Sequence, residues 1–146
     1  MTSSELENLV RIGKLKREPP SQAELAGLRA SGEARLTDAA NGSLSLASRF
    51  DLAYNAAHAL ASAALRRLGY RSENRYVVFQ TLPHTLGLSQ PVVRVLAKAH
   101  ETRNLAEYEG LLEVTERLVQ DVIAAAAIVR DALRIAAIPP DSVRDG

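Results

Sequence analysis

The segment from Leu44 to Leu68 constrains the fold of this chain more than any other part of its sequence. Apolar residues recur there at spacings of three and four, as they do on one face of an α-helix. One apolar stripe consists of Leu46, Phe50, Ala53, Ala57, Leu60 and Ala64, and a second of Leu52, Ala56, Ala59 and Ala63. A helix that is apolar around most of its circumference is packed by neighbours on several sides. The segment therefore predicts a central helix that ends at Gly69.

Further helices are predicted around this central one. Capping residues and proline or glycine breaks place them at residues 2–17, 21–39 and 74–82, from Ser89 onward, and at 113–137. The strong helix formers Ala and Leu occur 24 and 21 times, whereas strand-favouring residues are scarce. A chain of 146 residues suits a single core. We expect one all-α domain, an up-and-down bundle of four to five main helices. Its core spans about 21–138, with an N-terminal helix at 1–18 and a flexible tail at 141–146.

The composition excludes several classes of function. The chain has no cysteine, which rules out a disulfide framework, a thiol nucleophile and a thiolate zinc site. Its net charge of +1 gives no overall attraction to a polyanion. The longest apolar run, residues 122–129, is far shorter than the ~20 residues that cross a bilayer. We expect a cytoplasmic protein that uses no membrane, metal ion or cofactor, since its three histidines fall on separate elements.

Arg103 is the most informative candidate for a functional residue. On a helical wheel it falls in the middle of an apolar cluster made by Val92, Val95, Leu96, Ala99 and Ala106. A guanidinium keeps its charge, so its burial without a partner is costly. Arg103 must therefore meet a carboxylate, a carbonyl, a ligand anion or the mouth of a cleft. An ion pair inside the bundle is the purely structural alternative.

Tyr108 is the second candidate on the same segment. In an unbroken helix it would face away from Arg103. Asn104 and Gly110 both favour helix termination, so a turn near Asn104 would return Tyr108 to the side of Arg103.

These residues resemble landmarks of the HEPN superfamily. The stretch from Ala53 to Leu65, closing at Gly69, is similar to the long Ala- and Tyr-rich helix of that superfamily. His84 and the segment Arg103–Tyr108 also resemble HEPN landmarks, in the same order along about residues 25–137. The resemblance implies a helical bundle that is usually a homodimer. It also implies RNA or nucleotide association of the toxin–antitoxin or defence type, in some cases with a nucleotidyltransferase-type protein partner.

The resemblance leaves catalysis open, because one residue of the family's ribonuclease motif is missing. HEPN ribonucleases carry an Arg, four to six variable residues and a His. Arg103 matches the Arg and Asn104 the polar residue that often follows it, but Tyr108 stands nearest to the position of the His. RNA cleavage without a metal needs a base and an acid, which suits a His with a pKa near neutrality. A Tyr with a pKa near ~10 is a poor base at pH 7.

Three other polar residues border the predicted cleft. Asn55 and His58 lie on the narrow polar stripe of the central helix, and His100 lies close to Arg103 on the wheel. Either histidine could supply the missing proton transfer, although each is more simply explained as a structural residue, His58 hydrogen-bonded at the helix surface and His100 partly exposed. His84 is interpreted as a turn residue. The basic cluster formed by Arg11, Lys14, Lys16 and Arg17 is interpreted as a solvated helix end.

Three hypotheses follow for the function. The first is a non-catalytic or degenerate HEPN-like module whose cleft, formed by Arg103, Asn104, Tyr108, Asn55, His58 and His100, binds a nucleotide, an RNA or a partner protein. The second is a residual ribonuclease that uses Arg103 with Tyr108 or a nearby His. The third is a structural helical adaptor in which Arg103 forms a buried ion pair. Independently of these hypotheses, the apolar run at 122–129 is predicted to form either the bundle centre or a dimer interface.

Overall fold

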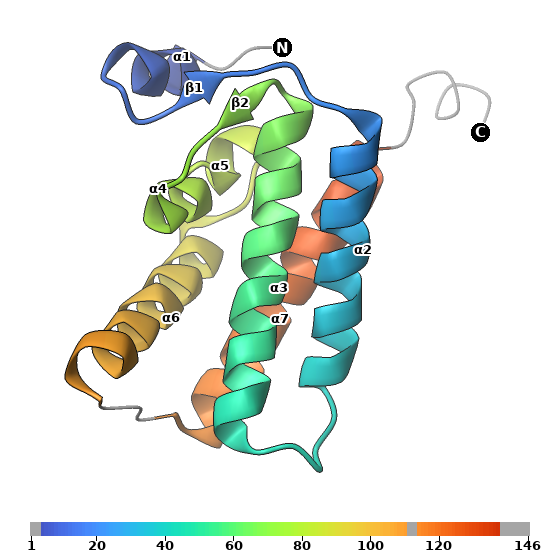
Figure 1. Ribbon diagram of the computed structural model, residues 1–146, viewed down its shortest axis with the longest axis vertical. Helices are drawn as coiled ribbons and strands as arrows, with labels where there is room; N and C mark the ends of the chain where they lie inside the picture. Colours follow the sequence, from blue (N-terminus) through green and yellow to red (C-terminus); the bar gives the residue numbers. More distant parts are fainter. Residues whose placement is uncertain (1–3, 111–113, 138–146) are drawn as a thin grey trace.

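The computed structural model describes residues 4–110 and 114–137, which form a helical bundle (Figure 1). In chain order the elements are α1 (Ser4–Arg11), β1 (Lys16–Arg17), α2 (Gln22–Ala39), α3 (Leu46–Arg67), β2 (Tyr70–Arg71), α4 (Arg75–Gln80), α5 (Leu82–Thr85), α6 (Gln90–Glu109) and α7 (Glu116–Ala136). The four long helices α2, α3, α6 and α7 confirm the predicted all-α architecture. The predicted tail at 141–146 lies outside the described residues.

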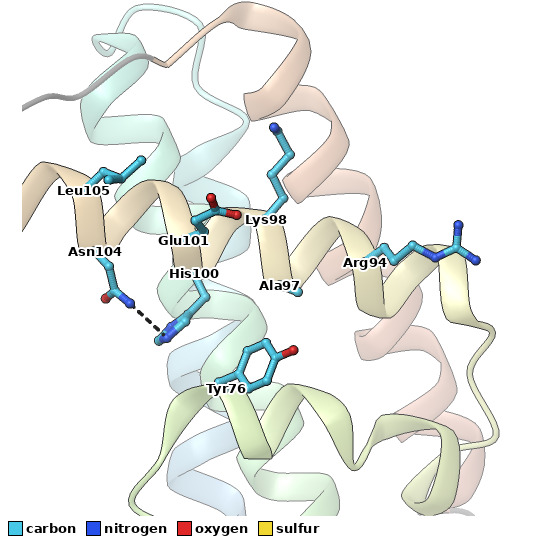
Figure 2. A pocket seen from close by; sticks show the side chains of 8 residues that line it. All are labelled: Tyr76, Arg94, Ala97, Lys98, His100, Glu101, Asn104 and Leu105. Carbon is cyan, nitrogen blue, oxygen red and sulfur yellow. Dashed lines mark hydrogen bonds between the residues drawn. The ribbon is translucent and has the colours of Figure 1, made fainter.

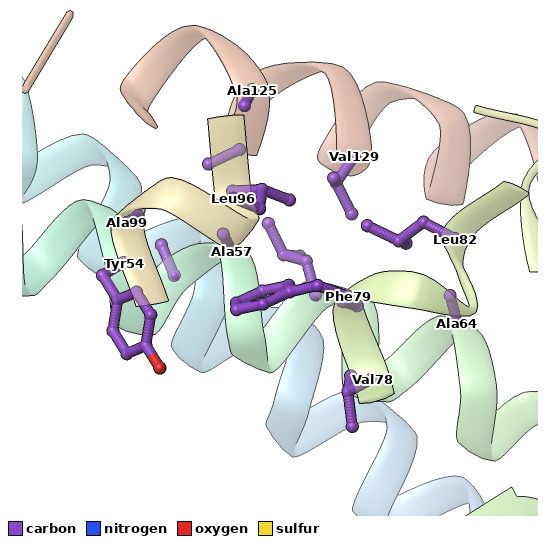
Figure 3. Close-up of a cluster of buried hydrophobic side chains, with 14 of the residues drawn as sticks. Tyr54, Ala57, Ala64, Val78, Phe79, Leu82, Leu96, Ala99, Ala125 and Val129 are labelled. Carbon is purple, nitrogen blue, oxygen red and sulfur yellow. The ribbon is translucent and has the colours of Figure 1, made fainter. Parts of the chain in front are cut away.

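Helix α3 is the central helix that its two apolar stripes predict. Residues on both stripes are buried, and α2 and α7 run alongside it (Figure 1). Phe79 of α4, Leu96 of α6 and Val129 of α7 converge on its apolar surface (Figure 3). The contact with α2 is closest at Gly32, where an added Cβ would lie 2.6 Å from the Cγ of Leu60. A side chain at position 32 would therefore force α2 and α3 apart.

Helix starts follow the capping residues in the sequence. The side chains of Ser21, Ser45, Asn74 and Thr115 each accept a hydrogen bond from the backbone N–H three residues further on. Such caps satisfy N–H groups that have no partner inside the helix. The last helix was predicted to begin at residue 113. In the structure Thr115 is its N-cap, so α7 begins at Glu116.

The N-terminal segment differs from the predicted helix over 2–17. Helix α1 ends at Arg11, and Lys16–Arg17 instead form the short strand β1, antiparallel to β2. Gly13 ends the helical path because its φ of 80° lies in the left-handed region. Three members of the predicted basic cluster, at positions 14, 16 and 17, therefore lie beyond the helix, and Arg17 pairs with Glu7.

Two further segments depart from the prediction in detail. The turn predicted around residues 83–87 contains the short helix α5, with His84 in its last turn. The apolar run at 122–129 contributes Val122, Ala125, Ala126 and Val129 to the core, whereas Ile128 is exposed. One face of this run therefore lies at the centre of the bundle.

No helix in the described ranges is both long and apolar enough to cross a membrane.

Candidate functional site

The candidate site is built around the ring of Tyr54, which is fully buried on α3. Arg103 of α6 reaches this ring, with its guanidinium carbon 5.3 Å from the ring centre. Arg103 is half-buried, as expected for a residue on an otherwise apolar helix face. The partner of its positive charge is the face of an aromatic ring, which the sequence had not suggested among the possible partners. A contact of this kind contributes about 0.5–2 kcal/mol.

A second arginine packs on the same ring. Arg75, the first residue of α4, lies with its guanidinium carbon 5.5 Å from the centre of the Tyr54 ring. Its Nη1 donates a hydrogen bond of 3.0 Å to Oδ1 of Asn55, and the Asn55 amide donates in turn to the backbone carbonyl of Asp51. Residues of three helices, α3, α4 and α6, thus bring two guanidinium groups to one aromatic ring. We call the group of Tyr54, Arg75 and Arg103 the arginine–tyrosine cluster.

Among the side chains that the structure describes, neither Arg75 nor Arg103 forms an ion pair. The ion pair that the structural alternative requires of Arg103 is therefore absent from the described side chains. Two half-buried cations that share no counter-charge attract an anion more strongly than exposed ones, because solvent screens them less.

His100 lies beside the cluster, as its place on the helical wheel predicts. Its Nε2 lies 3.2 Å from the Asn104 amide, and its Nδ1 lies 3.0 Å from the Tyr54 hydroxyl. When Nε2 accepts from the Asn104 amide, Nδ1–H donates to the hydroxyl of Tyr54. Burial lowers the pKa of His100 below its ordinary value, and the positive charges of Arg75 and Arg103 lower it further. The neutral ring is therefore favoured at neutral pH.

His58 lies on the other side of Arg75, one helical turn after Tyr54. Its ring packs edge-on against Phe79, with ring centres 6.0 Å apart, and its Nε2 lies 3.5 Å from the Ser62 hydroxyl. Burial lowers the pKa of His58 from 6.5 to about 4, with smaller contributions from the charges of Arg75 and Arg103. Both candidate histidines thus face the same two arginines, which brings together Asn55, His58, His100, Arg103 and Asn104 as the sequence predicted.

Two pockets adjoin the cluster. One of about 560 Å³ lies between α4 and α6, where His100, Asn104 and the exposed ring of Tyr76 line it (Figure 2). In this view the side chains of His100 and Asn104 point from α6 toward α4, and the Tyr76 ring faces them. The second pocket, of about 390 Å³, is lined by His58 and Arg75. Of the cluster itself, Arg75 lines the second pocket, so an anion can approach its guanidinium from solvent there, whereas the first pocket is lined by neighbours of the cluster.

The turn that would bring Tyr108 beside Arg103 does not form. Helix α6 continues through Asn104 to Glu109 and ends at Gly110, whose φ of 69° is left-handed. The prediction was wrong about the break at Asn104 because that side chain caps nothing and instead bonds to His100 one turn earlier. The side chain of Tyr108 lies outside what the structure describes.

Arg75, Tyr54 and Tyr76 are the site residues that sequence reasoning missed. Arg75 stands four residues before the buried Phe79, so it occupies the apolar face of α4 as Arg103 occupies that of α6. The same wheel argument applied to the short helix would have identified it. Nothing in the sequence marked Tyr54 as a site residue beyond its place on the central helix. Its role depends on the contacts that Arg75 of α4 and Arg103 of α6 make with its ring.

Within the described residues, no three histidine, aspartate or glutamate side chains are grouped so that they could hold a metal ion. The chemistry available at the cluster is therefore that of guanidinium, imidazole, amide and phenol groups. Comparisons of this chain with family models, with curated proteins and with solved structures find no match.

Proposed function

We propose that this chain is a non-catalytic binding module that holds a phosphate group of a nucleotide or an RNA at the arginine–tyrosine cluster. The observation that carries the proposal is the pair of half-buried guanidinium groups, Arg75 and Arg103, that share one aromatic ring and pair with none of the described carboxylates. The HEPN resemblance of the sequence, which remains a prediction, independently favours ligands of this class.

The chemistry of the two arginines supports a phosphate ligand. A guanidinium presents a planar fork of N–H donors that matches the oxygens of a phosphate. Packing on Tyr54 restricts the conformations of both side chains before a ligand arrives, so less entropy is lost on binding. Asn55 accepts from only one of the N–H groups of Arg75, which leaves other donors of that guanidinium for an anion.

The surroundings of the histidines favour binding over catalysis. Both ring nitrogens of His100 are occupied by hydrogen bonds to Tyr54 and Asn104. A general base needs a free nitrogen within reach of the proton that it removes. His58 is half-buried against Phe79, and its low pKa makes it a poor proton donor at neutral pH.

Binding measurements on matched variants test the proposal. We expect AMP or a short RNA to bind the wild-type protein in calorimetric titrations, and Arg75→Gln or Arg103→Gln to weaken binding about tenfold or more, because each removes a charged hydrogen bond worth about 1.5–3 kcal/mol. Arg35→Gln on α2 removes the same charge from an exposed position on the far side of α3 and should leave affinity unchanged. Absence of binding to both ligands, or equal losses in all three variants, would refute the proposal.

A ribonuclease remains the second candidate, favoured by one observation. The pKa of His100 is lowered beside two arginines, so its ring is neutral at pH 7, the state that a general base requires. Incubation of a mixed RNA pool with wild type and Arg103→Ala distinguishes the two candidates. Cleavage that disappears in the variant would establish the enzyme, whereas no cleavage, or equal traces in both samples, would exclude it.

The HEPN resemblance also predicts a homodimer and a nucleotidyltransferase-type protein partner. Sedimentation of the purified chain at several concentrations tests the dimer, since a stable dimer would keep twice the mass of the chain on dilution.

A further inference from the structure

The charge of the arginine–tyrosine cluster indicates which kind of phosphate it takes, an inference that rests on the proposed function. Two permanent positive charges, Arg75 and Arg103, meet at the Tyr54 ring. Both charges act on His58 and on His100, so all four groups belong to one electrostatic unit. Because the two histidines are neutral at pH 7, the unit carries two positive charges.

Among the described side chains, the carboxylates that line the two pockets form no ion pair with Arg75 or Arg103. Glu24 lines the pocket of His58 but is bound to Arg66 and Arg71. Glu73 lines the same pocket and Glu101 the pocket of His100, and neither forms an ion pair with an arginine of the cluster among the described side chains. The charges of Arg75 and Arg103 are therefore not held in a direct ion pair by any side chain that the structure describes.

We infer that the site selects the dianionic phosphate of a monoester, such as a nucleoside monophosphate or the phosphorylated end of an RNA, over the monoanionic phosphodiester inside a chain. A phosphate monoester carries about −1.5 to −2 charges at pH 7, because its second pKa is near 6. A phosphodiester carries a single negative charge and would leave one guanidinium without a counter-charge. That shortfall is costly at a half-buried position, where charges interact more strongly than in water.

A pair of ligands that differ by one charge tests the selectivity. AMP and its 5′-phosphate methyl ester share the base, the ribose and the attachment atom. In calorimetric titrations at pH 7.5 we expect the wild-type protein to bind AMP about tenfold or more tightly than the ester. Arg75→Gln and Arg103→Gln should each reduce the preference to about threefold or less, since one remaining guanidinium is balanced by either ligand. Arg35→Gln should keep the full preference.

An RNA pair identifies the source of the monoester. A six-nucleotide RNA is compared with a 5′-phosphate and with a 5′-hydroxyl end. A gain of about tenfold from the 5′-phosphate indicates an RNA end as the ligand, whereas AMP selectivity without this gain indicates a free nucleotide. Equal affinities for AMP and its ester, both weakened by Arg103→Gln, would overturn the inference and leave the proposed function standing. Binding of none of the four ligands would reject the proposed function itself.

Discussion

Arginines gather around α3 in two regions of this molecule, and the two regions differ in the groups that surround the positive charge. At the C-terminal end of α3 the guanidinium of Arg66 is almost fully buried and donates to the carbonyls of Glu18, Pro19 and Tyr70. It also pairs with the carboxylates of Glu18 and Glu24, which Arg71 shares. About three turns earlier on α3, Tyr54 meets Arg75 and Arg103, which contact its aromatic ring and pair with no carboxylate among the described side chains.

The difference separates a structural role from a binding role. The Arg66 region joins the segment after β1, the start of α2 and the end of α3, and its donors are used within the protein. The arginine–tyrosine cluster leaves donors of Arg75 unused at the pocket that this residue lines. A saturated guanidinium contributes to stability, whereas an unsaturated one is available to a ligand. Substitutions in each region can therefore test whether its arginines contribute mainly to stability or mainly to ligand binding.

The largest expected effect is on stability, from Arg66→Met. Removal of this guanidinium leaves three carbonyls without this donor and takes one of two arginine partners from Glu24, so we expect the free energy of unfolding to fall by about 3–5 kcal/mol. Urea denaturation followed by circular dichroism measures the change. Arg103→Met is the matched variant and should alter stability by about 2 kcal/mol at most, the upper value for the cation–π contact that it removes. Similar losses in both variants would remove the distinction between the regions.

The next effect is a dependence of stability on pH. The two regions are expected to lose stability in different pH ranges. The folded state holds His58 neutral down to a pKa of about 4, whereas the unfolded chain takes up a proton below about pH 6.5. The unfolded state therefore binds more protons as pH falls, and the free energy of unfolding should decrease by about 2 kcal/mol between pH 7 and 5. The pKa of Glu24 is lowered by Arg66, so the other region loses stability only below that window.

Denaturation of His58→Gln across the same pH range checks this assignment. The variant should lose markedly less stability than wild type between pH 7 and 5, with the remaining loss owed largely to His100, whose pKa is also lowered. Identical pH profiles for the two proteins would show that His58 is not held neutral in the folded state.

The smallest effect on stability comes from Asn55→Asp, which gives Arg75 the carboxylate that it lacks. Asn55 Oδ1 already accepts from Arg75 at 3.0 Å, so one carboxylate oxygen can keep that bond, while the other has to turn away from the Asp51 carbonyl to which the Asn55 amide donates. Stability should change by less than about 1 kcal/mol, while affinity for AMP should fall about tenfold, because the cluster then holds an internal anion. The same carboxylate should raise the pKa of His58, which an NMR titration of the imidazole would record.

Asn8→Asp is the control for this substitution. Asn8 on α1 accepts from Arg11 at 2.9 Å in an exposed pair of the same chemistry. We expect it to leave both ligand affinity and the pKa of His58 unchanged. An equal loss of AMP affinity in Asn8→Asp and Asn55→Asp would attribute the effect to net charge alone.

The fold was largely predictable because its main signals are local. The stripes of α3 and the caps at Ser21 and Asn74 act within one or two turns of helix, where sequence spacing translates directly into contacts. The β1–β2 pair was missed because it joins residues 16–17 to residues 70–71, and two-residue strands leave no periodic pattern. Tertiary pairing, which no local pattern encodes, decided that the N-terminal helix ends early.

The candidate site was predictable only where a polar residue contradicted its own helix face. Arg103 and His100 were identified because the wheel of α6 placed them beside apolar neighbours. Arg75 obeys the same logic on α4, but a helix of six residues offers too few positions for the pattern to stand out. That both arginines meet on Tyr54 depends on how three helices pack, and this packing could not be obtained from the spacing along any one of them.

The arginine–tyrosine cluster also helps to attach the outer half of α6 to the rest of the bundle. Helix α6 inclines away from α3 toward its C-terminal end (Figure 1), and none of residues 100–107 is buried. Beyond Ala99, this half of the helix is therefore attached to the bundle through few interior contacts, with Arg103 and His100 among its links to α3. An anion held by Arg75 and Arg103 would act as a clasp between α4 and α6. Amide hydrogens throughout the outer half of α6 would then exchange more slowly in the loaded protein, so hydrogen exchange would report occupancy of the site beyond the turn that carries Arg103.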